Sequence, residues 1–270
     1  MNGLRVVELL NRGDVPVAKG LANPLVRDPV RAMSFHGKDG LGDSNLPLPR
    51  IHSSEKNALD TISGEVDSSK RGELSIVCTG PLTNIAALLA SFPDSTKKIR
   101  EFVVMGGAYG ITKYGIGNVT PVAEFNIYAD PEAAKIVFES GIPIRAIGLD
   151  VTMVPENQLS LKDYAKIKQS RGRIPAFAAK ILNKNIRKHE IFALHDPMTV
   201  AVKLKASLFE FGGFRVSVET KGERTLGMTV RDRLQQTKEI PRGEKVMVCN
   251  HVDSQGFKRL FMDRLLGPSE

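Results

Sequence analysis

The sequence has few cysteines, no long apolar run and no leader-like N-terminus. Its two cysteines, Cys78 and Cys249, are too few for a disulfide framework or a zinc cluster. Each lies in a strand-like stretch, so we expect small buried side chains and a reducing cytoplasm. No apolar run approaches the roughly 18 residues that a membrane span needs. The first apolar stretch contains Glu8 and is followed by Arg12 and Asp14, which excludes a signal peptide.

The charge distribution is uneven, and the excess is basic. The sequence has 38 Lys and Arg against 30 Asp and Glu, which gives a formal net charge of +8. Nine of the basic residues fall within residues 162–191, where Asp163 and Glu190 are the only acidic ones. Such a run could form a phosphate-binding face. Because no nucleic-acid-binding module accompanies it, we favour a solvated helix face and expect no nucleic-acid partner.

Apolar residues make up 41% of the 270, which is enough for a hydrophobic core and excludes long disorder and low complexity. Short β-like runs alternate with helical ones, which predicts an α/β fold, a Rossmann-like and mostly parallel sheet flanked by helices. We find no internal repeat and no linker, so we expect one domain over residues 1–270. The expected helices cover residues 3–11, 53–63, 82–92, 133–140, 160–169, 175–188, 196–204 and 254–266. The expected strands cover residues 15–18, 74–78, 102–105 and 144–149, with 214–219, 225–230 and 245–249 as a late antiparallel addition.

Polar residues that follow the expected strands are the first candidates for a site. In an open α/β sheet the ligand site lies beyond the carboxyl ends of the strands. Four places qualify on this ground: residues 35–42, residues 78–84, residues 104–107 together with 117–126, and residues 194–197.

Taken singly, several of these residues also have ordinary structural explanations. His36 stands among glycines and could be a turn residue that bonds to its own backbone. Thr79 and Thr83 flank Gly80-Pro81, and their spacing favours helix-capping groups. The sequence alone leaves these alternatives open.

Helix-start signals offer a similar choice. Asp130-Pro131-Glu132 predicts an Asp N-cap, Pro in the first turn and an acidic first turn. Asp196-Pro197 has the same pattern, so Asp196 taken singly is expected to be an N-cap and nothing more. Glu124 and Asn126 are two residues apart, so they share a face if their segment is extended.

Together these segments resemble the inosine-uridine type nucleoside hydrolases, a family of calcium-dependent N-ribohydrolases. The matching runs occur in order along the chain: HGKDGLG (36–42), CTGPLTNIA (78–86), VMGGA (104–108), GNVTPVAEFNIYADPEAA (117–134) and LHDP (194–197). The run at 117–134 is long and specific. The resemblance extends from Leu4 to near the C-terminus and implies the nucleoside hydrolase fold.

The resemblance implies roles for the residues that touch the substrate. Asn118, Glu124 and Asn126 would hold the ribose hydroxyls, with Met105 packed against the sugar. His195 would assist departure of the base by donating a proton or a hydrogen bond to it, which suits an imidazole at physiological pH.

It also implies a metal site and a base pocket. Asp196 would be a carboxylate ligand of Ca²⁺, and Thr79 would supply its backbone carbonyl. Both are hard oxygen donors, which Ca²⁺ prefers. His36 would line the base pocket.

The sequence departs from the family at its start. Family members begin with a strand that ends in Asp-x-Asp-x-Gly-x-Asp-Asp, which supplies two metal-binding aspartates and the general base. Residues 1–4 match the middle of the following helix, so we expect the first βα unit (roughly 30 residues or more) to be absent. Asp39 and Asp43 are not placed to substitute. We therefore expect poor metal binding and two unpaired sheet edges, because the first strand is normally interior.

We expect a ribonucleoside hydrolase that cleaves the N-glycosidic bond of uridine, inosine or cytidine to ribose and free base, with activity impaired by the missing aspartates. Because every later site residue is in place, we favour an N-terminally truncated enzyme over a divergent one. The alternative is a catalytically inactive protein that binds a nucleoside or ribose. The resemblance also implies a cytoplasmic homodimer or homotetramer that acts in nucleoside salvage.

Overall fold

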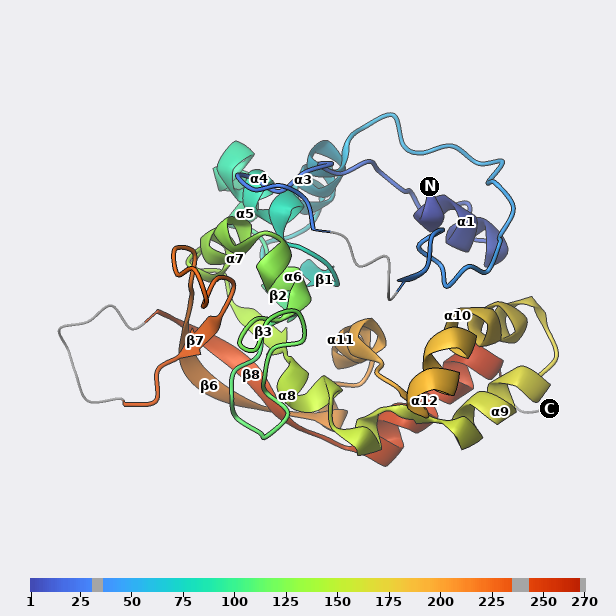
Figure 1. Ribbon diagram of the computed structural model, residues 1–270. Helices are drawn as coiled ribbons and strands as arrows, with labels where there is room; N and C mark the ends of the chain where they lie inside the picture. The colour runs from blue at the N-terminus through green and yellow to red at the C-terminus, as the bar shows by residue number, and fades with distance from the viewer. Residues whose placement is uncertain (31–35, 235–242, 268–270) are drawn as a thin grey trace.

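The computed structural model describes residues 1–30, 36–234 and 243–267. Within them, six strands form one sheet in the order β1-β2-β3-β8-β6-β7 (Figure 1). Neighbours from β1 to β8 are parallel, whereas β6 is antiparallel to both β8 and β7. The sheet strands are β1 (Ser75–Cys78), β2 (Glu101–Met105), β3 (Ile144–Ile147), β6 (Phe209–Val218), β7 (Thr229–Arg231) and β8 (Glu244–Val252). A separate antiparallel pair joins β4 (Leu159–Ser160) to β5 (Ile191–Phe192).

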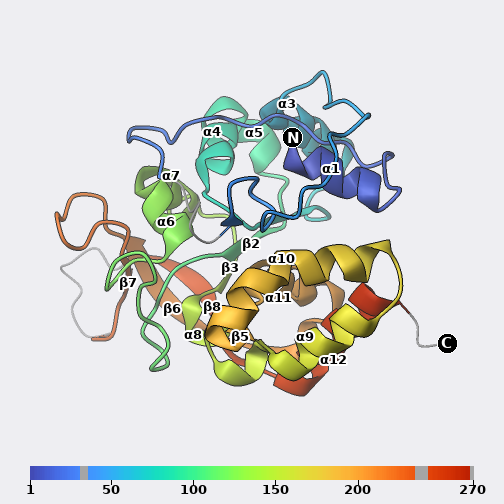
Figure 2. The same cartoon turned by 45° about the vertical axis from the view of Figure 1, so that its right-hand side comes forward.

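Helices cover both faces of the sheet, which confirms the predicted α/β fold. Helices α3, α4 and α7 pack on one face and α9 to α12 on the other, a division visible in Figures 1 and 2. The helices are α1 (Asn2–Leu9), α3 (Ala58–Ser68), α4 (Thr83–Ser91), α5 (Pro93–Thr96), α6 (Phe125–Ala129), α7 (Pro131–Phe138), α8 (Leu149–Thr152), α9 (Leu161–Gln169), α10 (Arg173–His189), α11 (His195–Leu204) and α12 (Ser254–Leu266). Short 3₁₀ turns occur at η1 (Pro155–Asn157) and η2 (Ala206–Leu208).

Strand β2 shows how the sequence produces two cores. Its five residues are all buried. Phe102 and Val104 belong to the core under α3, α4 and α7, whereas Val103 belongs to the core under α9 to α12. This alternation follows from the two-residue period of a strand, and a strand covered on both faces is mostly apolar. The exception in β2 is Glu101, which is paired with Arg145 and Lys203.

The prediction of a strand at residues 15–18 is wrong. This segment is irregular, and its backbone bonds to the approach to α3 instead of to the sheet. The carbonyl of Val17 accepts from the Ser54 amide, and that of Lys19 accepts from the Ala58 amide, both at 2.8 Å. The local apolar pattern predicted a strand here, but this segment pairs with none of the described strands. Residues 31–35 of the following loop lie outside the described residues.

Two expectations about the sheet also need correction. Segment 245–249 is not part of a purely antiparallel addition, because β8 pairs parallel with β3 on one side and antiparallel with β6 on the other. The sheet was expected to have two unpaired edges, yet the six described strands are contiguous from β1 to β7, and in the parallel part β1 alone has a neighbour on one side only. Strand β8 continues the sheet beside β3, so the parallel part is not split.

Asp130 is the N-cap of α7, as predicted, and its buried carboxylate also joins three segments. Its Oδ1 accepts from the Ala133 amide at 3.1 Å, and its Oδ2 accepts from the Leu25 amide at 2.9 Å. The hydroxyl of Thr83 donates to the same Oδ2 at 2.6 Å. The expectation that Thr83 caps its own helix is therefore wrong, because its hydroxyl is used in this long-range contact.

The glycine-rich loop after β2 is held by Asp150, which is fully buried on α8. Its carboxylate accepts from the backbone amides of Tyr109 at 2.8 Å, Ile111 at 2.6 Å and Thr112 at 3.3 Å. The guanidinium of Arg231 donates to two carbonyls of the same loop. A loop with few side chains is thus fixed by one anion and one cation, which satisfy its backbone groups.

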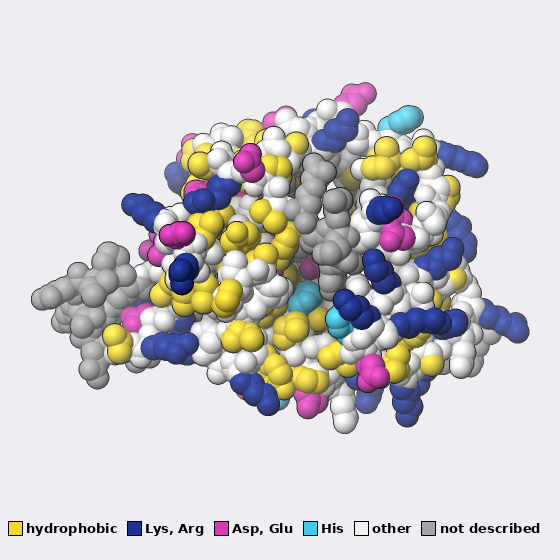
Figure 3. All heavy atoms as spheres, viewed as in Figure 1, with side chains coloured by type: hydrophobic (Ala, Val, Ile, Leu, Met, Phe, Trp, Pro, Cys, Tyr) yellow, Lys and Arg dark blue, Asp and Glu magenta, His cyan; other side chains and the backbone are white. Residues whose placement is uncertain are grey.

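Two composition-based expectations can be compared with the surface and the core. Cys78 and Cys249 are free and buried, as predicted. All nine basic residues of segment 162–191 are exposed, and Lys and Arg gather on the side where α9, α10 and α12 lie (Figure 3). Their role as a solvated face stays a prediction. Among the described residues, no helix combines the length and apolarity that a membrane span requires.

Candidate active site

The candidate site lies where the parallel strands end. Cys78 aligns with Val104, and Met105 aligns with Ile147, so β1, β2 and β3 end at one edge of the sheet. Helix α11 packs against these three strands. It begins at His195, and its far end is fixed by Lys203, whose ammonium lies 2.6 Å from the carboxylate of Glu101 in β2.

Glu124 organises the side of the site next to β2. It is buried and is the N-cap of α6. Its Oε1 accepts from the Asn126 amide at 2.9 Å, and its Oε2 accepts from the Gly107 and Ile127 amides at 3.1 Å each. Gly107 has a φ of +87°, and a Cβ there would lie 2.6 Å from the Tyr109 ring, so a side chain at this close approach is excluded.

Three further predicted residues are joined to this helix start. Asn126 donates through Nδ2 to the Met105 carbonyl at 3.1 Å and contacts its sulfur at 3.2 Å. Asn118 accepts through Oδ1 from the Phe125 amide at 2.9 Å. Glu124 and Asn126 were expected to share a face if their segment were extended, but it is not extended, since α6 begins at Phe125. A tight helix start, rather than a shared strand face, brings Glu124 and Asn126 together.

The electrostatics link Glu124 to Asp196. Burial, with a smaller contribution from the charge of Asp196, raises the pKa of Glu124 to about 6 against the opposing effect of its three amide hydrogen bonds. Asp196 remains accessible to solvent, yet partial desolvation raises the pKa of its carboxyl to about 6. The Asp196 carboxylate is therefore near enough to Glu124 for its charge to be felt there.

Asp196 does not cap its helix, so the N-cap expectation is wrong. Helix α11 begins at His195, and the N-cap residue is Leu194, which makes no side-chain capping bond. Within the described part of the chain, the Asp196 carboxylate accepts no hydrogen bond. It stands in the first helical turn, where the helix dipole favours an anion. The carboxylate is free for a ligand.

His195 is held by a contact from helix α8. Its Nδ1 lies 2.9 Å from the hydroxyl of Thr152, which ends α8 just after β3. Burial lowers the pKa of the imidazole to about 4, so the ring is neutral at physiological pH. A neutral imidazole offers one donor and one acceptor nitrogen.

His36 and Thr79 are the two remaining predicted site residues. Both are exposed. Thr79 directly follows β1 and therefore lies at the same sheet edge. The loop from His36 to Gly42 approaches α10, where a Cβ on Gly42 would lie 2.8 Å from the Cα of Ile181. Asp39 in this loop accepts three backbone amides, which lower the pKa of its carboxyl, so it is a turn-forming residue and not a base.

The described residues supply only part of a metal site. They contain no group of three or more His, Cys, Asp or Glu side chains placed to hold a metal ion. The nearby carboxylates of Glu124 and Asp196 provide hard oxygen and negative charge, which is the donor chemistry that a divalent cation such as Ca²⁺ requires. The donors fit such a cation in kind, but they fall short of six to eight in number.

The pKa of Glu124 predicts a pH dependence of stability. Because the folded-state pKa of about 6 exceeds the ordinary 4.5, Glu124 favours folding below pH 4.5 and loses this effect as pH rises through 6. In chelator-treated protein, the unfolding free energy of the wild type relative to Glu124→Gln should fall by about 2 kcal/mol from pH 4 to 7.

Urea denaturation at stepped pH measures this difference. Glu139→Gln is the matched control, because Glu139 is exposed and removal of its charge should leave the pH profile unchanged. Because the folded-state pKa of His195 is lowered, His195 makes the unfolding free energy rise between pH 4 and 6.5. This contribution is the same in wild type and Glu124→Gln, so it cancels in their difference. A flat difference between wild type and Glu124→Gln would contradict the prediction.

Sequence reasoning missed Asp150 and Thr152. Both lie on α8, the short helix that follows β3. The rule applied to the other strands, to look at polar residues just beyond the carboxyl end, would have selected them. Their partners, Tyr109 and His195, are about 40 residues away in sequence, so no local pattern reveals the contacts.

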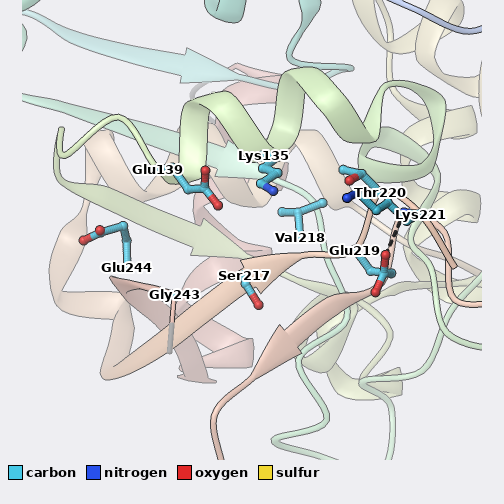
Figure 4. Close-up of a pocket in the computed structure, with 9 residues that line it drawn as sticks. All are labelled: Lys135, Glu139, Ser217, Val218, Glu219, Thr220, Lys221, Gly243 and Glu244. Carbon is cyan, nitrogen blue, oxygen red and sulfur yellow. Dashed lines mark hydrogen bonds between the residues drawn. The ribbon is translucent and has the colours of Figure 1, made fainter. Parts of the chain in front are cut away.

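A hollow of about 650 Å³ lies elsewhere, between α7 and the strands β6 and β8 (Figure 4). Its walls carry charges of both signs, including Lys135, Glu139 and Lys221. Glu219 in its wall accepts from the Lys221 and Gly222 amides and so shapes a turn. None of the predicted site residues lines it.

Comparison with known proteins gives consistent relatives. The family model of the inosine-uridine preferring nucleoside hydrolases matches residues 1–259. The pyrimidine-specific ribonucleoside hydrolase RihA of Shewanella sp. (strain ANA-3) is 41% identical over 98% of this chain and 82% of its own length. A solved plant nucleoside hydrolase, PpNRh1, superposes with a TM-score of 0.89 at 29% identity, over 99% of this chain and 85% of that one. The solved structure of the purine-preferring ribonucleoside hydrolase of Gardnerella vaginalis superposes with a TM-score of 0.85 at 31% identity, over 98% of this chain and 84% of that one.

Proposed function

This chain belongs to the inosine-uridine preferring nucleoside hydrolase family, whose members hydrolyse ribonucleosides to ribose and base, and we propose how its residues divide that reaction. The observation that carries the proposal is the convergence of two elements. The start of α6 brings Glu124 and Asn126 to the end of β2, and the start of α11 brings His195 and Asp196 to the same sheet edge.

The first part of the proposal concerns the ribose. Asn118, Glu124 and Asn126 hold its hydroxyls, and Met105 packs against the sugar. The side-chain amide nitrogen of Asn126 donates to the Met105 carbonyl, which leaves the amide oxygen to accept from a ribose hydroxyl. A buried carboxylate close to the sugar also stabilises the positive charge that grows at C1′ as the glycosidic bond breaks.

The second part concerns the base. His195 donates a hydrogen bond to the base as the C1′–N bond electrons move onto it. His36 lines the base pocket from the loop that approaches α10. Uridine is the substrate that we propose first, because the RihA relatives are named as pyrimidine-specific, whereas other neighbours are named for purines.

The third part concerns the metal. The family is generally metal-dependent, and we propose that the ion is Ca²⁺, held by the Asp196 carboxylate and the Thr79 carbonyl. When bound, such an ion positions ribose hydroxyls and makes a water easier to deprotonate. These two oxygens are fewer than the six to eight that Ca²⁺ takes, and substrate hydroxyls and water would add to them. Homodimers or homotetramers are the assembly that we propose.

The ribose assignment is tested with Asn126→Ala. Loss of the amide removes a contact to the sugar, so kcat/KM for uridine should fall about 100-fold, in line with one or two lost hydrogen bonds to a buried partner. Ribose release in the presence of CaCl₂, followed by a reducing-sugar assay, measures it. Asn57→Ala is a control distant from the site, because Asn57 caps α3.

Two results would count against the proposal. Equal kcat/KM in Asn126→Ala and wild type would remove Asn126 from the ribose site. Binding of uridine without ribose release, even by the chain preceded by a family Asp-rich strand and its helix, would favour the alternative of a catalytically inactive nucleoside-binding protein.

A further inference from the structure

Thr152 is a buried polar residue that the proposed reaction has not used. It ends α8, directly after β3, and is fully buried. Its hydroxyl oxygen lies 2.9 Å from Nδ1 of His195, 43 residues away. Since α8 is fixed by the bonds of Asp150 to the glycine-rich loop, this hydroxyl presents a rigid contact to the imidazole.

The direction of this hydrogen bond follows from an account of buried donors. The hydroxyl has one proton, and a buried donor without an acceptor is destabilising. Among the residues that the structure describes, Nδ1 of His195 is the only partner of the Thr152 hydroxyl. The other buried threonine near this histidine, Thr199, donates to the His195 carbonyl at 3.3 Å and leaves the ring alone. The Thr152 proton therefore points to Nδ1.

The protonation pattern of the ring is then determined. A neutral imidazole has one N–H, so a ring that accepts at Nδ1 carries its proton on Nε2. We propose that Thr152 is a positioning residue that fixes His195 in the Nε2–H tautomer, so that Nε2–H is the donor presented to the departing base. This inference rests on the proposed function for its purpose. The ring keeps its proton, and the electron pair of the C1′–N bond stays on the base.

The tautomer can be measured without turnover. In ¹⁵N-labelled protein of the full 270 residues, the ring-nitrogen shifts of His195 distinguish Nε2–H from Nδ1–H. Wild type and Thr152→Ser should show a protonated Nε2 and a hydrogen-bonded acceptor at Nδ1. Thr152→Val should shift the Nδ1 signal to the position of an unbonded acceptor, or move the proton to it. Thr199→Val, the matched control, should leave both signals unchanged.

The purpose of the contact is tested with two substrates. For uridine, whose base is a poor leaving group, Thr152→Val should lower kcat about 10- to 100-fold, and Thr152→Ser should restore it to within about threefold. For p-nitrophenyl β-D-ribofuranoside, whose leaving group needs no donor, kcat should change less than threefold. Thr199→Val should leave the ratio of the two rates unchanged.

The failures can be told apart. A proton on Nδ1 in the wild type overturns the tautomer, whatever the activity. Equal losses on both substrates in Thr152→Val overturn the positioning role and leave Thr152 as a packing residue. Cleavage of neither substrate even when the wild-type chain is preceded by a family Asp-rich strand and its helix, with the Nε2–H pattern intact, contradicts the proposed function and leaves the tautomer established without its purpose.

Discussion

Replacement of Asp196 by asparagine is expected to lower kcat/KM for uridine by at least about 1,000-fold, the scale of loss when a charged group at a reaction centre is removed. Asparagine has the same shape but no charge. The carboxylate caps no helix and accepts no hydrogen bond from the described residues, so the fold does not depend on it. Because its pKa is raised, the substitution should leave the melting temperature unchanged or higher.

Asp94→Asn is the matched control. Asp94 also lies in the first turn of a helix, α5, but it is exposed and bonds to Lys97 at 2.8 Å. This variant should retain the activity of the wild type. The assignment of Asp196 fails if Asp196→Asn keeps more than a tenth of the activity, or if its loss of activity accompanies a lower melting temperature.

The fold could be predicted largely from local patterns. The alternation of apolar runs identified β1 to β3, and the Asp-Pro pair at 130 identified the start of α7. The errors came where local pattern and long-range pairing disagree. Residues 15–18 have the composition of a strand but lack a strand neighbour, and β8 pairs with β3 and β6, which no local feature of residues 244–252 specifies.

The candidate site was predicted in outline, with incorrect local geometry. Glu124 and Asn126 were selected on a motif, yet a helix start brings them together rather than an extended strand. Asp196 was read, on its own, as a cap, although its helix begins one residue earlier. The sequence identifies which motif residues are present and in which order. The positions of their hydrogen-bonding partners depend on tertiary packing.

The contacts to distant partners could not be predicted at all. Thr152 reaches His195 across 43 residues, and Thr83 reaches Asp130 across 47. Each contact depends on how two strands align their ends in the sheet. A single sequence contains the residues but not this register, so the positioning groups became visible only in the structure.

The second large effect concerns the metal. The described residues place two neighbouring carboxylates at the site and no larger acidic group, and the 270 residues contain no Asp-x-Asp-x-Gly-x-Asp-Asp signature. Ca²⁺ affinity follows the number and charge of its oxygen ligands. We therefore expect the 270-residue chain alone to bind Ca²⁺ at least about 100-fold more weakly than the same chain preceded by a family Asp-rich strand and its helix.

Isothermal titration with CaCl₂ compares the two proteins. Asp196→Asn in the extended protein should weaken Ca²⁺ binding again, because Asp196 and the aspartates of the added strand would hold the same ion. If the extended and the 270-residue proteins bind Ca²⁺ equally well, the described residues suffice and the account of the metal site is wrong.

The measurement that most directly tests the central claim is ribose release from uridine and inosine, with 1 mM CaCl₂, by both proteins side by side. The claim is that these 270 residues carry the ribose-binding and leaving-group parts of a nucleoside hydrolase site, and that the Asp-rich signature completes it. The account predicts ribose release by the extended protein that exceeds that of the 270-residue chain by about 1,000-fold or more. Equal rates from the two proteins, or no ribose from either, would contradict it.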